Sequence, residues 1–255
     1  MDMIRYAAEV SYDGSKFYGW QRQRGLPSVQ GAIEESLFLL NGKECVTVTG
    51  AGRTDAGAHA AAQVCSFKMA REWGERELML ALNSNLPDGV TVMRTARVRQ
   101  DFNARYDAVS REYMYFIWNA SSIYPHIKPF TCWLKRGNYD WSLASLACAY
   151  LEGEHDFKNF CRAGNSYGRT VRQLYSVRLR RKGNLIRLHV VGNGFLTNMV
   201  RIIAGCLESV AAKEHDPEWI GELLTAGRSR SDGGKTLTSS GLFLWKINYN
   251  PPLWN

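Results

Sequence analysis

The chain has 255 residues, which is enough for one large domain or two smaller ones, each with its own hydrophobic core. It carries neither an apolar signal-peptide region at its start nor an apolar run of membrane-spanning length, so we expect a cytoplasmic protein without a membrane segment. A net charge of +8, with arginine as 22 of the 32 basic residues, favours a polyanionic partner, although such a charge also aids solubility alone.

The first half of the chain predicts the element order β-α-β-β-α-β. Apolar and polar residues alternate over residues 4–12, which predicts a strand. Ser28 can cap the next helix, which has apolar residues along one face and ends at Gly42. The other elements of this half are expected at residues 45–49 and 63–69 (strands), 75–85 (a helix) and 90–98 (a strand).

The second half predicts the same order again. Asp140 can cap its first helix, over residues 141–153, and the turn Lys182-Gly183-Asn184 joins two of its strands. The other elements are expected at residues 112–118, 170–180, 185–191 and 241–249 (strands), and 195–212 and 217–227 (helices). The repeated order is that of a ferredoxin-like α+β fold. We place the two halves at residues 1–105 and 106–255, and expect a ligand site in a cleft between them.

The connection "VTGAGRTDAGAHAAAQV", residues 48–64, is more than twice as long as a usual hairpin loop. The corresponding turn of the second half, Lys182-Gly183-Asn184, is short, so the long connection is an addition to the duplicated scaffold. Ordered loops of this length inside a compact domain are often functional, and the glycines allow the backbone to approach a ligand closely.

Asp55 is the only acidic residue of this connection, and Arg53 lies two positions before it. A neighbouring cation keeps a carboxylate ionised, and an ionised carboxylate can act as a nucleophile. Two other interpretations stay open. Asp55 can instead close a turn by a side-chain hydrogen bond, or the loop can grip a phosphate, although it lacks the lysine of a P-loop.

Two further segments combine aromatic rings with cations. In "YDGSKFYGWQRQ", residues 12–23, rings alternate with cations that include Arg22, and Arg24 follows directly. Tyr113 and Tyr115 point to the same face of their expected strand. Such rings can stack on nucleic-acid bases, or they can belong to the hydrophobic core.

Arg201 lies within an otherwise apolar helix, where an arginine is rarely buried without a partner, and Asp55 is a candidate for that partner. The alternative is an arginine on the solvent face of the helix. A basic run marks the second-half hairpin and is either a phosphate-binding surface or a solvated face. Its members are Arg169, Arg172, Arg178, Arg180, Arg181, Lys182 and Arg187.

No metal or cofactor motif is visible. The six cysteines are scattered and form no Cys-x-x-Cys pair, which indicates reduced thiols rather than a zinc or redox site. Neither a Gly-x-Ser-x-Gly segment, nor a His-Glu-x-x-His segment, nor a dinucleotide-binding fingerprint occurs. We therefore expect neither a metal nor an organic cofactor.

Seven segments, taken in order, resemble the tRNA pseudouridine synthase A family, and "GRTDAG" is the most specific part of the match. They are "YDGSKFYGWQRQ", "SVQGAIEE", "GAGRTDAGAHA", "LNSNLP", "FNARYDAVSREYMY", "LEGEHDF" and "GNGFLTNMVRIIAG". The resemblance implies two ferredoxin-like halves that form one extended mixed sheet around a basic active-site cleft. It also implies isomerisation of uridine to pseudouridine at nucleotides 38, 39 and 40, in the anticodon arm of tRNA.

The resemblance further implies roles for single residues. Asp55 matches the family's catalytic aspartate, Tyr113 the tyrosine that stacks on the target base, and Arg201 the basic residue that pairs with the aspartate. Arg53 matches an arginine that helps to displace the flipped nucleotide. The family works as a homodimer on one tRNA, without metal or cofactor. Weaker candidates for RNA contacts are Arg22, Arg24, Arg105, Arg111, Arg169 and Arg172.

The chain departs from the family pattern in two places. It has Asn103-Ala104-Arg105-Tyr106 where His-Ala-Arg-Phe is common, and 238–242 read Thr-Ser-Ser-Gly-Leu where a Pro-Ala-x-Gly-Leu-like segment is common. Three alternative functions stay open: a related synthase for other RNA positions, a tRNA-binding or folding module without catalysis, and a base-excising glycosylase that uses an aspartate.

Overall fold

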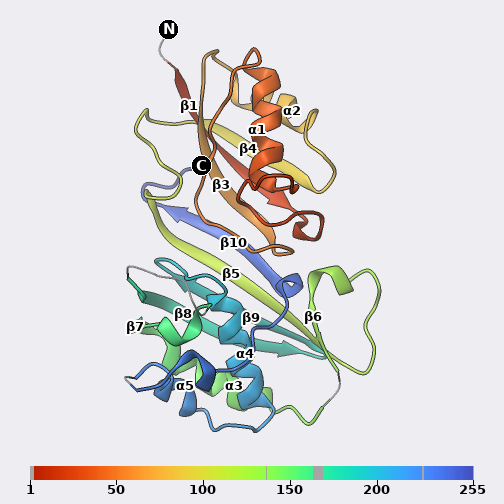
Figure 1. The fold of residues 1–255 in the computed structure, drawn as a ribbon, viewed down its shortest axis with the longest axis vertical. Helices are drawn as coiled ribbons and strands as arrows, with labels where there is room; N and C mark the ends of the chain where they lie inside the picture. The colour runs from red at the N-terminus through yellow and green to blue at the C-terminus, as the bar shows by residue number, and fades with distance from the viewer. Residues whose placement is uncertain (1–2, 136, 163–168, 226, 255) are drawn as a thin grey trace. The chain divides into compact units, whose positions relative to one another are not determined.

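The structure is a computed structural model that describes residues 3–135, 137–162, 169–225 and 227–254. The chain folds into two compact units. Unit 1 comprises residues 1–109 and 244–255, and unit 2 comprises residues 110–243. Figure 1 shows both units in the colours of the chain order. The split into halves at residues 105 and 106 stays a prediction.

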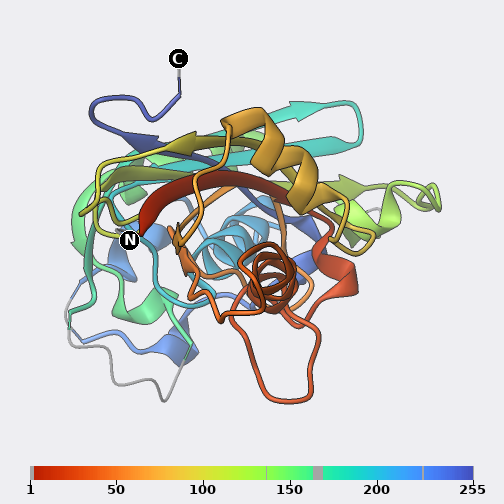
Figure 2. The ribbon, with the colours of Figure 1, turned by 90° about the horizontal axis from the view of Figure 1, so that it is seen from above.

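Unit 1 has the predicted β-α-β-β-α-β order. Its elements are β1 (Ile4–Tyr12), α1 (Val29–Leu40), β2 (Thr49–Gly50), β3 (His59–Met69), α2 (Glu75–Asn83) and β4 (Val90–Arg97). Strand β1 pairs antiparallel with both β3 and β4. The buried side chains of Tyr6 and Val10 on β1 belong to the same core as Ile33 and Leu37 on α1. Figure 2 looks nearly along α1, with β1 curving beside it.

The start and the end of α1 follow the sequence signals. The Ser28 side chain accepts a hydrogen bond from the Gly31 N–H, and Gly42 adopts a φ of 67° just after the helix. These are the N-cap and the left-handed stop that the sequence predicts. The helix is therefore fixed at both ends by local residues.

Replacing Ser28 by alanine should lower the free energy of unfolding by about 1 kcal/mol, since the buried Ser28 hydroxyl satisfies an otherwise unpaired helix N–H. Urea unfolding monitored by circular dichroism measures this change. Ser28→Asp is the matched control, because aspartate is also a good N-cap. An alanine variant as stable as the parent chain would show that the cap is dispensable.

The second half of the chain repeats the order and adds short elements. Its main elements are β5 (Ala108–Asn119), α3 (Trp141–Ala147), β8 (Val171–Lys182), β9 (Leu185–Gly192), α4 (Met199–Ala211) and β10 (Leu242–Tyr249). Strands β6 (Cys132–Leu134) and β7 (Gly153–Asp156) are additions to the predicted pattern, whereas the short helix α5 (Trp219–Glu222) lies within the helix expected over residues 217–227. Most of β10 belongs to unit 1.

Ten strands of the described chain form one sheet, in the order β4-β1-β3-β10-β5-β9-β8-β7, with β2 on β3 and β6 on β5. The sheet is mixed because β6 runs parallel to β5, whereas β5, β9 and β8 are antiparallel neighbours. The predicted α+β class with one extended mixed sheet is therefore confirmed.

Several element boundaries differ from the prediction, among them the start of β3, which is His59 rather than residue 63. Residues 45–48 are not a strand, and only Thr49–Gly50 pairs with β3. The reason is that side chains of α1 bind the backbone of Val48 in place of a neighbouring strand. The Val48 N–H donates to Glu34, and its carbonyl accepts from Gln30. The helix expected over residues 195–212 begins only at Met199, because Asn198 has a left-handed φ of 64°.

The first helix of the second half is also shorter than predicted. It ends at Ala147 and continues as a tight turn over Cys148–Leu151. The predicted cap holds, since the Asp140 side chain accepts from the Ser142 N–H at 3.1 Å. Hydrogen bonds from Ser142 hold the pKa of the Asp140 carboxyl below its usual value.

Candidate active site

The long connection of unit 1 is a loop whose two ends are held together by hydrogen bonds between β2 and β3. Gly50 of β2 pairs with Cys65 of β3, so the loop proper, which we call the crown, is residues 51–58. At its base the Ala51 N–H donates to the Val64 carbonyl at 2.8 Å. The Gln63 side chain donates to the Gly52 carbonyl, also at 2.8 Å. The crown is thus anchored on β3 rather than loosely attached.

The crown contains buried, partly buried and exposed side chains. Arg53 is exposed, Thr54 is 7% exposed, and Asp55 is partly buried. Behind Asp55 the chain turns, since the Ala58 N–H donates to the Asp55 carbonyl at 3.1 Å, and Gly57 has a φ of 78°. A carboxylate and a guanidinium are therefore presented on either side of a buried threonine.

The segment of residues 13–20, which we call the platform, packs against the crown and is joined to it by backbone hydrogen bonds. The Trp20 N–H donates to the Thr54 carbonyl at 3.2 Å, and the Gly57 N–H donates to the Phe17 carbonyl at 3.3 Å. Phe17 and Trp20 are buried, whereas the Tyr18 ring is 53% exposed. Of the two interpretations of this aromatic segment, core packing holds for Phe17 and Trp20, and only Tyr18 offers an exposed ring.

Two glycines permit this close packing. A side chain on Gly14 would place its Cβ 1.9 Å from the Ala58 carbonyl oxygen, and one on Gly50 would lie 2.5 Å from the Trp20 ring. Both distances are impossible for real Cβ atoms, so glycine is required where the platform meets the crown and the strand below it. The glycines of this region therefore serve packing as well as turns.

His59 is a site residue that the sequence did not single out. It is fully buried, and its Nδ1 accepts a hydrogen bond from the Gly14 N–H at 3.0 Å. Asp13 Oδ1 lies 3.3 Å from the same nitrogen, but that oxygen also accepts from the backbone and side chain of Ser15. Because Nδ1 is occupied as an acceptor, we assign the neutral ring with its proton on Nε2. His59 therefore joins the start of β3 to the platform without adding charge.

Arg201 and Tyr113 both lie in unit 2. Arg201, in the first turn of α4, is partly buried; its Nε donates to the Leu237 carbonyl at 2.7 Å, and its Nη1 to Asn198 Oδ1 at 2.9 Å. The Tyr113 ring is 6% exposed and meets Phe195 edge to face, with ring centroids 4.8 Å apart. Both side chains are held by their own unit. Whether Arg201 pairs with Asp55 stays a prediction.

Tyr115, on the same face of β5 as Tyr113, is a core residue. It is fully buried, and its hydroxyl donates to the Thr238 carbonyl at 2.6 Å. Burial raises the pKa of this phenol well above its usual value, so the ring stays neutral. Of the two strand tyrosines, Tyr115 thus follows the core interpretation.

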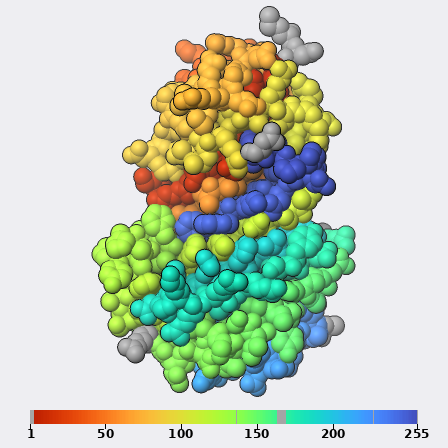
Figure 3. Space-filling model, turned by 180° about the vertical axis from the view of Figure 1, so that it is seen from behind, coloured from red at the N-terminus to blue at the C-terminus, as the bar shows by residue number. Residues whose placement is uncertain are grey.

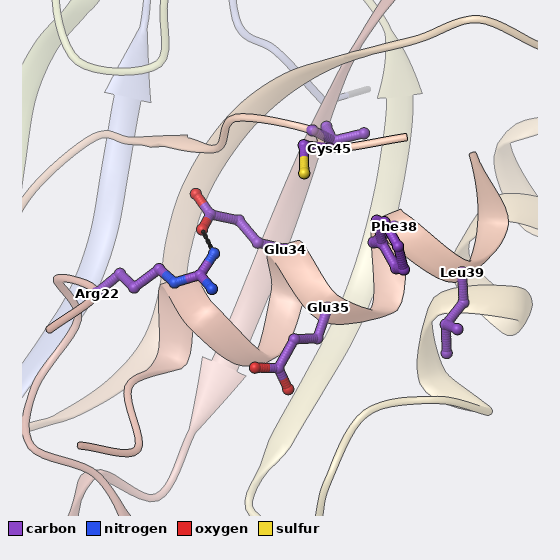
Figure 4. A pocket seen from close by; sticks show the side chains of 7 residues that line it. Arg22, Glu34, Glu35, Phe38, Leu39 and Cys45 are labelled. Carbon is purple, nitrogen blue, oxygen red and sulfur yellow. Dashed lines mark hydrogen bonds and ion pairs between the residues drawn. The ribbon is translucent and has the colours of Figure 1, made fainter. Parts of the chain in front are cut away.

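The weaker RNA-contact candidates are divided between the two units. In unit 1, Arg22 pairs with Glu34 at 2.9 Å, and the Arg105 guanidinium lies 5.7 Å from the centre of the Tyr106 ring. Arg24 is exposed in the turn that follows Arg22. A surface pocket of about 400 Å³ lies beside the Arg22–Glu34 pair, lined also by Phe38, Leu39 and Cys45 (Figure 4). No crown residue lines this pocket.

In unit 2, Arg111 and Arg172 are engaged by backbone carbonyls. Arg111 Nη1 donates to the Asn193 carbonyl at 2.9 Å, and Arg172 Nη1 donates to that of Arg169, also at 2.9 Å. Arg169 itself is exposed. These contacts fix the two guanidinium groups beside the turn that leads into α4.

The β8–β9 hairpin sorts its basic residues by face. Val177 and Leu179 are buried on one face, so Arg178 and Arg180 point to the other. Arg180 lies directly across from Arg187 of β9, whereas Arg178 forms an ion pair with Glu152 at 2.5 Å. In Figure 3 the hairpin, in blue-green, lies at the surface that faces the viewer. Like charges directly across a strand pair are unfavourable alone and favour an anionic partner.

The two departures from the family pattern have structural explanations. Asn103 Oδ1 accepts from the backbone N–H groups of Arg105 and Tyr106 and so closes a turn. A hydrogen bond from the Asn103 N–H, together with one from Arg99, lowers the pKa of the Asp107 carboxyl. In the second segment, the Ser240 hydroxyl donates to the Thr131 carbonyl at 3.1 Å.

Among the described residues, no group of three or more His, Cys, Asp or Glu side chains is arranged to hold a metal ion. No helix in the described part of the chain is both long and apolar enough to cross a membrane.

Comparisons with known proteins point to one family. A family model described as "tRNA pseudouridine synthase" matches residues 8–107 and 147–250. The tRNA pseudouridine synthase A of Coxiella burnetii (strain Dugway 5J108-111) is 36% identical over 249 residues, which cover 98% of this chain and 94% of the relative. That of Oceanobacillus iheyensis is 38% identical over 248 residues, with 97% of each chain covered.

A third relative of the same name, from Bacillus pumilus, is 37% identical over 97% of this chain and 100% of its own. Among solved structures, a chain of the crystal structure of a Cbf5-Nop10-Gar1 complex aligns with 94% of this chain and 49% of its own length. Its identity of 11% and TM-score of 0.39 are too low to support a conclusion.

Proposed function

Because the chain belongs to the tRNA pseudouridine synthase family, and is an isomerase that modifies tRNA, we propose that it converts uridine to pseudouridine in the anticodon arm. The proposed targets are nucleotides 38, 39 and 40, and the proposed nucleophile is Asp55. The observation that carries the proposal is the crown, which presents the partly buried Asp55 and the exposed Arg53 on an anchored base.

The reaction is balanced within the substrate. The bond between uracil N1 and ribose C1′ breaks, a bond between C5 and C1′ forms, the C5 proton leaves, and N1 gains a proton. A carboxylate suits this exchange because it adds readily and also leaves. Attack of Asp55 at C1′, attack at C6 of the base and a route through a glycal share this balance. Exclusion of water keeps the detached base in place during its rotation.

We assign three further roles. The target nucleotide must leave its stack, which costs a few kcal/mol. Arg53 would take part in displacing it, which its exposure supports, and Tyr113 would stack on the flipped base. Arg201 would act as the cation for the reacting carboxylate, and its two hydrogen bonds within unit 2 support a fixed guanidinium.

We also propose that the enzyme acts in the cytoplasm as a homodimer, with one tRNA contacting both subunits. The exposed Arg24 and Arg169, together with Arg22, Arg105, Arg111 and Arg172, are the proposed contacts to the tRNA backbone. Light scattering of the purified protein tests the proposed dimer, and the mass of a monomer at working concentration would contradict it.

The test of the function uses unmodified tRNA labelled with tritium at uracil C5. We expect release of tritium without free uracil, and pseudouridine mapped to nucleotides 38, 39 and 40. Pseudouridine at other positions would indicate a related synthase with a different target. Free uracil would indicate a glycosylase, and tRNA binding without tritium release would indicate a module without catalysis.

Replacing both Arg180 and Arg187 by glutamine should weaken tRNA binding and reduce its salt dependence. Each lost phosphate contact lowers the slope of log K against log salt by about one, so we expect a decrease of roughly two. Filter binding over a range of salt concentrations measures it. The control is Arg94→Gln with Arg99→Gln, which changes the net charge equally but removes arginines paired with Glu9 and Asp107. Equal effects of both pairs would assign the change to net charge alone.

A further inference from the structure

The backbone at Thr54 and at Asp55 is held by hydrogen bonds to neighbouring segments. Thr54, directly before it, is buried, and its carbonyl accepts from the Trp20 N–H at 3.2 Å. The carbonyl of Asp55 itself accepts from the Ala58 N–H at 3.1 Å. Because the backbone is held at Thr54 and Asp55, it sets the position from which the Asp55 carboxylate extends.

A side chain from outside the crown completes this arrangement. The Tyr12 hydroxyl lies 2.8 Å from Thr54 Oγ1, and both groups are buried. This hydrogen bond is shorter than the backbone contacts that join the platform to the crown, which measure 3.2 and 3.3 Å. It therefore links the residue next to Asp55 directly to the sheet.

Tyr12 is well suited to act as a fixed support. It ends β1, where it faces Ala60 of β3 on one side and Val90 of β4 on the other. The side chain is 4% exposed, and its ring lies against the ring of Trp20, with centroids 6.2 Å apart. Groups mounted on strands hold a reacting side chain more accurately than groups on free loops.

We infer that Tyr12 is a positioning residue for Asp55, acting through its hydrogen bond to Thr54. The inference rests on the proposed role of Asp55 in the reaction. It gives Tyr12, which directly precedes the platform, a function in catalysis rather than in RNA binding. Tyr12 does not touch the substrate in this scheme; it sets the backbone from which the carboxylate reaches the reacting base.

The experiment compares Tyr12→Phe with Tyr6→Phe. Tyr6 is the matched control because it lies on the same face of β1, is fully buried, and loses comparable hydrogen bonds, to the backbone of Trp73. We expect Tyr12→Phe to slow single-turnover pseudouridine formation roughly 10- to 100-fold, the size of a small misplacement at a reacting centre. The Kd for tRNA should stay unchanged, and Tyr6→Phe should keep the parent rate.

Thr54 supplies the second half of the test. Thr54→Val removes the hydroxyl at constant shape and should slow the reaction as much as Tyr12→Phe. Thr54→Ser keeps the hydroxyl and should recover most of the rate. Because both changes break one hydrogen bond, the variant with Tyr12→Phe and Thr54→Val together should be no slower than the slower single variant.

Two results separate the inference from the function on which it rests. An Asp55→Ala variant with the parent rate would overturn the proposed role of Asp55. If Asp55→Ala is inactive but Tyr12→Phe reacts within twofold of Tyr6→Phe, Tyr12 has no positioning role. A weakened Kd for tRNA in Tyr12→Phe, with an unchanged rate at saturation, would also overturn the inference, because it would place Tyr12 in RNA binding.

Discussion

Replacing Asp55 by alanine is expected to abolish pseudouridine formation while tRNA binding persists. Removal of a nucleophile typically lowers the rate by about 10⁴-fold or more, because no other group takes over its bond to the substrate. Within residues 50–64, Asp55 is the one carboxylate. Tritium release under single-turnover conditions measures the rate, and filter binding measures the Kd for the same tRNA.

The persistence of binding distinguishes a lost reaction from a lost fold. Asp55 is partly exposed at the crown, and Thr54 and Gly57 hold the backbone without using its side chain. Asp55→Asn keeps the shape and should be as inactive as Asp55→Ala. Asp88→Ala, which removes an exposed carboxylate at the turn before β4, is the control and should keep the parent rate. Residual tritium release in Asp55→Ala close to the parent rate would falsify the mechanism.

The sequence predicted those parts of the fold that depend on neighbours in the chain. The alternation of β1, the Ser28 cap and the short turn at Gly183 are local signals, and each has its expected structure. The strand expected over residues 45–49 was wrong for most of its length. Its cause is not local, because Gln30 and Glu34 of α1 reach across to the backbone of Val48.

In the candidate site, too, only the residues with a local sequence signal could be predicted. Asp55 stands out in the sequence because it is the one acidic residue of a glycine-rich loop that is longer than a usual hairpin connection. Tyr12 does not, since its contact to Thr54 joins residues 42 positions apart, and an aromatic residue at the end of a strand suits a core equally well. His59 has no local signal for the same reason: its partner Gly14 lies 45 positions away. Supporting contacts of a site are long-range, so they become visible only in the fold.

Replacing Arg201 by alanine should lower the rate of pseudouridine formation about 100- to 1000-fold, the effect of removing one fixed electrostatic partner from a reacting centre. Arg201 is flanked by the buried Val200 and Ile202, an environment that a guanidinium enters only when it is bound by other groups. Arg201→Lys keeps the charge but loses the planar fork, so we expect it to recover only part of the rate.

The same arginine also stabilises its own unit, and the experiment must separate the two effects. Its Nε binds the Leu237 carbonyl, and the next carbonyl, that of Thr238, is held by the Tyr115 hydroxyl at 2.6 Å. Tyr115→Phe therefore loosens the same segment without removing a cation, and should stay within about threefold of the parent rate, since the reacting groups are untouched. If Tyr115→Phe is as slow as Arg201→Ala, Arg201 acts by holding residues 237–238 and not through its charge.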